Sequence, residues 1–81
     1  MPEITRFYGI MIKMFFGQNY PHIFALYDEY IGIIDIQTLE MLEGDLPDRA
    51  ESFVIEWAKT NQKDLLEMWD KKEVKKLKPL E

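Results

Sequence analysis

The hydrophobic pattern of this chain changes its period at Pro47, and this change constrains the fold more than any other feature. Before Pro47, apolar residues alternate or form short runs rich in β-branched and aromatic side chains, as in strands. After Pro47, an apolar stripe follows helical spacing, at Ala50, Phe53, Val54, Trp57 and Ala58. Strands followed by helices predict an α+β domain, an antiparallel meander covered on one face. The alternative is a small β-roll with helices packed at its edge.

The first 44 residues are expected to form the sheet portion. Turn signals separate the candidate strands, such as the glycine of Tyr8-Gly9, which favours a hairpin. In the second strand, the two-residue period assigns Ile10, Ile12, Met14 and Phe16 to the core face, and Met11, Lys13 and Phe15 to the opposite face. The expected strands cover residues 4–7, 10–16, 22–27, 30–36 and a short 39–42.

Residues 47–75 are expected to form a two-helix portion. Residues 76–81 are expected to form a tail, because Pro79 cannot continue a helix. Pro47 and nearby acids mark the start of the first helix. Asn61 predicts a break and a cap for the second helix, over about 62–74. That helix should turn Leu65, Leu66 and Trp69 inward, and both tryptophans are expected in or beside the core. Together the 81 residues form a single small domain in this interpretation.

Composition excludes several classes of protein. The chain has no cysteine, so disulfides and thiolate metal sites are excluded. It shows no secretory signal and no apolar run of roughly 20 residues, so we expect a cytoplasmic protein without membrane contact. Residues 1–70 carry 13 acids against five bases, which disfavours nonspecific nucleic-acid binding and suits a basic protein partner. The lysines at 71, 72, 75, 76 and 78 are expected to be a solvated helix end rather than a nucleic-acid contact.

The segment 19–36 predicts a central hairpin that turns at Asp28-Glu29. A two-residue turn pairs Tyr27 with Tyr30, Ala25 with Gly32, Ile23 with Ile34 and His22 with Asp35. These pairs divide the hairpin into two faces. Because Ala25 and Gly32 are small, we assign to the helix layer the face with Ile23, Ala25, Tyr27, Tyr30, Gly32 and Ile34. A three-residue loop would shift every partner by one and remove the His22–Asp35 pairing.

The opposite face of this hairpin is the candidate binding surface. It places Phe24, Leu26, Ile31 and Ile33 between His22 and Asp35. Four large apolar side chains on an uncovered sheet face usually mark an interface, so we expect self-association or a protein partner here. Alternatively, the C-terminal residues Val74, Leu77 and Leu80 fold back and cover this face.

Catalytic and metal chemistry has weaker support. His22 is the only histidine and could act as a base tuned by Asp35 in a small nuclease or phosphate-handling enzyme. A structural histidine, hydrogen-bonded locally at the start of a strand, is the alternative that we favour. A magnesium site could be imagined on Asp28, Glu29, Glu40, Glu43 and Asp45, but no motif holds these acids together. We therefore expect no metal and no cofactor.

Several segments carry a family resemblance. MPEITRFYGI, NYPHIFALY, IDIQTLE, the GDLP turn and the EWA helix are similar to segments of the small prokaryotic family called domain of unknown function 4160. The resemblance covers nearly the whole chain. Members often lie beside other small domains in toxin–antitoxin-like arrangements, which implies a protein partner or a regulatory role. No established catalytic activity comes with the family.

The departures from the family pattern concern the central hairpin. Members commonly have a pattern like P-P-H-x-H, followed by an acidic residue and Y-G. Only Pro21, His22 and Tyr27 carry over, and the other positions hold Tyr20, Phe24, Leu26 and Asp28. If the histidine pair binds metal or transfers protons in other members, half of that apparatus is missing here. The chain is thus expected to be an interaction or regulatory module rather than an enzyme.

Overall fold

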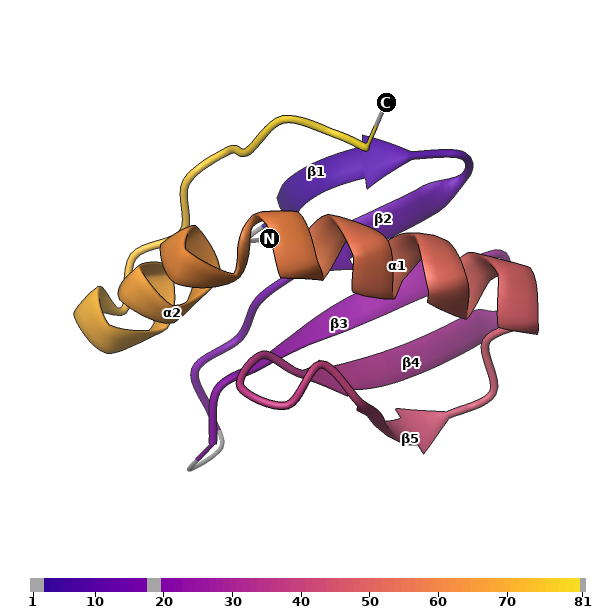
Figure 1. Cartoon of the computed structure of the whole chain (residues 1–81), viewed down its shortest axis with the longest axis horizontal. Coiled ribbons are helices and arrows are strands. Elements are labelled where there is room, and N and C mark those ends of the chain that lie inside the picture. Colours follow the sequence, from indigo (N-terminus) through magenta and orange to yellow (C-terminus); the bar gives the residue numbers. More distant parts are fainter. Residues whose placement is uncertain (1–2, 18–19, 81) are drawn as a thin grey trace.

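Five antiparallel strands form one sheet in the order in which they occur along the chain; α1 crosses one of its faces, and α2 continues from α1 beyond the ends of the strands (Figure 1). The structure is a computed structural model that describes residues 3–17 and 20–80. The predicted α+β meander is confirmed. Met1, Pro2 and Glu81, at the ends of the expected sheet and tail portions, lie outside the described residues. The elements are β1 (Glu3–Phe7), β2 (Ile10–Lys13), β3 (His22–Tyr27), β4 (Tyr30–Asp35), β5 (Met41–Gly44), α1 (Asp48–Thr60) and α2 (Gln62–Lys71).

Both predicted hairpin turns contain residues with positive φ. Tyr8 and Gly9 adopt φ of 50° and 80°, and Asp28 adopts 52°. A two-residue turn needs this left-handed conformation, which aspartate tolerates better than most side chains. The central hairpin therefore keeps its two-residue turn, and the predicted register is confirmed from Tyr27↔Tyr30 to His22↔Asp35.

The predicted helix-facing side of the central hairpin is buried in the structure. Ile23, Ala25 and Ile34 are inaccessible to solvent and belong to the same cluster as Val54 and Trp57 of α1. We expected the small Ala25/Gly32 pair to admit a helix. Instead, the space beside Gly32 is filled from the β5 side, since a Cβ atom on this glycine would lie 2.6 Å from Leu46 Cδ1 and 3.1 Å from Met41 Sδ.

Four of the five strands have different bounds from those expected. β1 begins one residue earlier, at Glu3, β4 ends one residue earlier, at Asp35, and β5 ends at Gly44 rather than at residue 42. β2 ends at Lys13 rather than at residue 16, although Met14 stays buried and Phe16 packs against the core. β5 begins at Met41 rather than at Leu39, which adopts φ of 62°. The delay follows from a turn after β4, in which Asp35 Oδ1 accepts hydrogen bonds from the backbone N–H groups of Gln37 (2.7 Å) and Thr38 (3.1 Å).

The helices agree with their expected positions except at α2. It ends at Lys71 because Lys72 adopts φ of 54° and its N–H, with that of Glu73, bonds back to Trp69 O and Met68 O. On α2, Met68 is buried together with Leu65 and Trp69, whereas Leu66 is half-buried. The expected cap was also wrong. Asn61 Nδ2 donates to Trp57 O, 2.9 Å away, so this side chain caps the end of α1 and not the start of α2.

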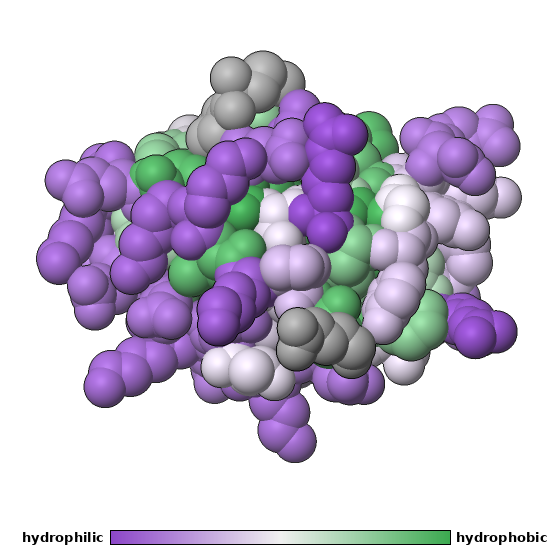
Figure 2. Space-filling view, turned by 90° about the horizontal axis from the view of Figure 1, so that it is seen from above, coloured by the Kyte–Doolittle hydropathy of each residue, from purple (hydrophilic) through white to green (hydrophobic). Residues whose placement is uncertain are grey.

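The residues after α2 run along the outer edge of β1 (Figure 1). Leu77 N donates to Ile4 O over 3.2 Å, and Trp57 Nε1 donates to Lys78 O over 2.8 Å. The apolar side chains Val74, Leu77 and Leu80 pack against the buried core. The view onto this edge in Figure 2 shows hydrophilic side chains with hydrophobic residues between them. An unpaired edge strand invites association with other chains, and this segment shields β1 from it.

Candidate functional site

The outer face of the sheet, directed away from both helices, carries the four predicted apolar residues together. Side chains alternate between the faces of a strand, so Phe24 and Leu26 of β3 lie on this face beside Ile33 and Ile31 of β4. Ile31 is 48% exposed, and the other three are half-buried. The segment with Val74, Leu77 and Leu80 packs against the core instead, so the alternative that it covers these residues was wrong. We call Phe24, Leu26, Ile31 and Ile33 the apolar patch.

Strand β2 extends the apolar patch with residues that the binding-site prediction did not include. Met11 pairs with Leu26, Lys13 pairs with Phe24, and the Phe15 ring lies 5.2 Å from the Phe24 ring in an edge-to-face arrangement. The sequence placed Lys13, Met11 and Phe15 on one side of their strand, but it did not predict the β2–β3 register. It is the β2–β3 register that brings these three residues beside the apolar patch.

A shallow cavity of about 570 Å³ lies over the β1–β2 hairpin. It opens between the charged side chains of Arg6, Lys13 and Asp28 and the apolar side chains of Met11 and Leu26. The outer face is therefore hollowed on its β2 side. On its β4 side, the side chain of Ile31 is exposed to solvent.

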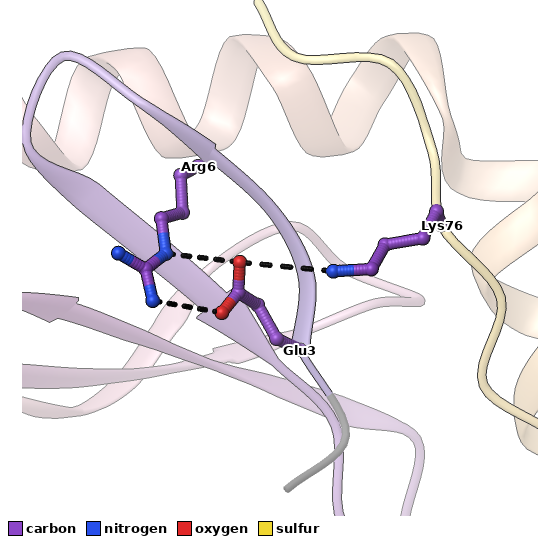
Figure 3. Close-up of polar contacts among 3 residues, drawn as sticks. All are labelled: Glu3, Arg6 and Lys76. Atoms are coloured by element: carbon purple, nitrogen blue, oxygen red, sulfur yellow. Dashed lines mark hydrogen bonds and ion pairs between the residues drawn. The ribbon is translucent and has the colours of Figure 1, made fainter.

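Charged residues border the apolar patch on two sides. On β1, Arg6 forms a bidentate ion pair with Glu3 at 2.9 and 3.0 Å, and Lys76 Nζ lies 3.8 Å from Glu3 Oε2 (Figure 3). The hydrogen bond from Arg6 lowers the pKa of Glu3, and the same bond raises the pKa of Arg6. On β5, the acidic Glu43 pairs with Ile33 and is exposed.

His22 and Asp35 are cross-strand neighbours whose polar atoms bond to nearby backbone groups. His22 Nδ1 lies 2.8 Å from Tyr20 O, and because this oxygen only accepts, Nδ1 carries the proton. The ring is 1% exposed, with the rings of Phe24 and Trp69 each at 5.2 Å. Asp35 Oδ1 is held in the turn after β4. This arrangement is that of a structural histidine hydrogen-bonded locally.

The remaining charged candidates do not gather into a site. Within residues 3–17 and 20–80, no three histidine, aspartate or glutamate side chains come together as metal ligands would, including the acids from Asp28 to Asp45. Lys71 pairs with Glu67 at 3.0 Å, and Lys72 lies over the Phe16 and Trp69 rings. These lysines take part in contacts within the chain.

A second concave surface lies where the hairpin turns meet the start of α1. This groove, of about 620 Å³, is lined by Tyr8, Tyr27, Arg49 and Phe53 among others. The rings of Tyr8 and Phe53 lie 4.8 Å apart, and the Arg49 guanidinium lies over Phe53. The sequence did not predict this groove, because its lining comes from three separate segments.

Comparisons with known proteins give one match. Neither the curated proteins nor the solved structures contain a significant match to this chain. In the described part of the chain, no helix has the length and apolar character needed to cross a membrane. The profile of the family DUF4160, described as a domain of unknown function, matches residues 9–70, from the β1–β2 turn to the last turn of α2. The chain therefore belongs to the DUF4160 family.

Proposed function

We propose that this chain is a small protein-interaction or regulatory module, one component of a two-protein pair of the toxin–antitoxin-like kind, which associates through the apolar patch. The observation that carries the proposal is the exposure of Ile31, which is 48% exposed at the β4 end of a row of apolar side chains that begins at Met11 and continues through Leu26. Scattered exposed apolar residues are ordinary, but a contiguous group bordered by charges is typical of a binding surface.

The competing function, a nuclease or phosphate-handling enzyme, would use His22 and Asp35. A general base must reach the proton of its substrate. The His22 ring is almost fully buried, and its Nδ1 already bonds to Tyr20 O. Asp35 Oδ1 accepts two backbone hydrogen bonds in a turn. Both groups have a structural role, which supports the interaction module over the enzyme.

The charge of the chain favours a partner of a particular kind. The whole chain has a net charge of −5, and its single concentration of lysines lies at the C-terminal end. Complementary charge speeds encounter and suppresses wrong partners. The proposed partner is therefore a small basic protein, and the absence of cysteine agrees with a pair that acts in the cytoplasm.

Co-expression with the product of the neighbouring gene, followed by a pull-down, tests this proposal. The wild-type chain is expected to retain the partner, and Ile31→Glu to lose it, because the new carboxylate would be buried at the interface. Ser52→Glu adds the same charge at an exposed position of α1 and is expected to retain the partner. Equal capture by both variants would contradict the role of the patch.

The enzyme alternative is tested separately. A metal- or base-dependent cleavage activity of the wild-type chain that is lost in His22→Ala would support it. The interaction proposal expects no such activity in either protein. Circular dichroism of His22→Ala distinguishes lost chemistry from lost structure, since the ring is part of a buried aromatic group.

A further inference from the structure

We propose that the outer face is complementary to itself, and that a second copy of this chain binds it across a twofold axis that runs parallel to the strands, between β3 and β4. This inference rests on the proposed function, association through the apolar patch, and states what covers the patch when the basic partner is absent: a second copy of this chain, which competes with that partner for the same surface. It follows from the order of charged side chains across the sheet, from the positions of the shallow cavity and of the exposed Ile31 on the outer face, and from the symmetry of homodimers.

The first observation is a row of four side chains that crosses the sheet. Lys13 of β2 pairs with Phe24 of β3, Phe24 pairs with Ile33 of β4, and Ile33 pairs with Glu43 of β5. Cross-strand partners share a face, so all four lie on the outer face. From β2 to β5 the row therefore runs base, apolar, apolar, acid, with its centre between β3 and β4, and Glu3, the cross-strand partner of Lys13, continues it onto β1 with a second acid.

A twofold axis along the strands at this centre reverses the row in the second copy. Phe24 then lies over Ile33 of the second copy, and Lys13 lies over Glu43 of the second copy. The symmetry repeats each contact, so one dimer has two such ion pairs. A twofold axis across the strands would instead place Lys13 over Lys13 and Glu43 over Glu43. Because like charges face each other in that arrangement, the charge pattern selects the axis along the strands.

The positions of Ile31 and of the shallow cavity on the outer face agree with the same axis. In the neighbouring row, Met11 pairs with Leu26 and Leu26 pairs with Ile31. The rotation places the exposed Ile31 of one copy over Leu26 of the other. Leu26 and Met11 line the shallow cavity of about 570 Å³, so the exposed Ile31 side chain of one copy faces the cavity of the other.

The size of the face sets the expected strength. Four strands about 4.8 Å apart, each contributing about five residues, give a plan area of roughly 300 Å² per copy. Stable interfaces of standard size bury about 800 Å² per partner, so this contact belongs with the weak ones. We expect a dimer with a dissociation constant in the micromolar range or above, as is usual for small contacts of this kind.

A charge swap tests the inference by sedimentation of the full chain from low micromolar to high micromolar concentration. Lys13→Glu and Glu43→Lys are each expected to weaken the wild-type dimer by about tenfold or more, because each places two like charges together at both sites. The double variant, with both changes, is expected to regain an affinity within about threefold of the wild type. Three strand spacings separate the two positions within one chain, roughly 14 Å, so this rescue must come from contacts between copies.

Controls separate folding from association. Lys13→Glu adds an acid beside Glu3, so circular dichroism must show an intact fold. Lys13→Gln and Glu43→Gln add no repulsion and are expected to weaken the dimer less than the charge reversals. If Lys13→Glu does not fold, the neutral variants Lys13→Gln and Glu43→Gln, together with Glu43→Lys, still test whether these two residues form ion pairs between the copies.

Three results would overturn the inference: a wild type that stays monomeric, single reversals with unchanged affinity, or a double variant as weak as the single ones. Its failure differs from failure of the proposed function. If the wild type is monomeric but Ile31→Glu still loses a co-expressed partner, the apolar patch binds a different protein. That result would contradict the homodimer but not the proposed function.

Discussion

The two faces of the central hairpin have the same kind of side chains but opposite surroundings. Ile23 and Phe24 are neighbours in β3, yet Ile23 is inaccessible to solvent beside α1, whereas Phe24 lies half-buried on the outer face. In β4, the neighbours Gly32 and Ile31 show the same difference, since Gly32 is buried and Ile31 is exposed. The comparison teaches that apolar character alone does not define the core. The covered face is expected to determine stability, and the outer face to determine association.

The largest expected change in the free energy of unfolding comes from shortening a buried side chain on the covered face. Ile23→Ala removes fully buried methyl and methylene groups, and such changes lower the free energy of unfolding by about 2–5 kcal/mol. Phe24→Ala is the matched change on the outer face, and it is expected to lower that free energy by less because the ring is only half-buried. Urea denaturation measures both variants. Equal losses would break the distinction between the faces.

A smaller effect is expected from filling the close contact at Gly32. In Gly32→Ala, the new Cβ would lie 2.6 Å from Leu46 Cδ1, so Leu46 must move, at about 1–3 kcal/mol for overpacking. Gly17→Ala is the control, because a Cβ there meets no atom within 4 Å. Its free energy of unfolding should stay within about 1 kcal/mol of the wild type or rise. Thermal denaturation of both variants compares them, and a harmless Gly32→Ala would contradict this packing.

Asp35, at the end of β4, is expected to stabilise the fold through the turn that follows this strand rather than through packing on either face. Asp35→Ala removes the acceptor of two backbone hydrogen bonds, which should lower the free energy of unfolding by about 1–2 kcal/mol. Asp35→Asn keeps a side-chain oxygen and is expected to lose less. Denaturant titrations at neutral pH measure the difference. An Asp35→Ala variant as stable as the wild type would show that the turn does not need this side chain.

The smallest effect concerns the charged border on β1. Arg6 holds the pKa of Glu3 below its usual value in the folded chain, so this ion pair contributes stability above the usual pKa of a free glutamate. That contribution is lost as the pH falls through the lowered pKa. In Glu3→Gln, this part of the acid-side decline should disappear, with only a slight change at neutral pH because the pair is exposed. Unfolding measured from neutral to acidic pH tests it, and identical pH profiles for both proteins would contradict it.

The sequence predicted the central hairpin and its faces because alternation in Ile23–Tyr27 and Tyr30–Ile34 leaves one consistent register around a two-residue turn. It failed where single side chains override the pattern. Asp35 delays β5 by holding a turn, and Lys72 ends α2 in a left-handed conformation that glycine more commonly adopts. At the candidate site, the four patch residues were predicted to share a face. The contributions of Met11 and Lys13 depend on the β2–β3 register, which local patterns do not encode.

The most direct test of the account measures mass and stability together in Ile31→Glu. This position is exposed, so the free energy of unfolding is expected to stay within about 0.5 kcal/mol of the wild type. In light scattering, the mass of the wild type is expected to rise above the 9.7 kDa of one chain with concentration, while the variant stays at the monomer mass. A variant that associates like the wild type, or that loses several kcal/mol of stability without a change in mass, would contradict the account.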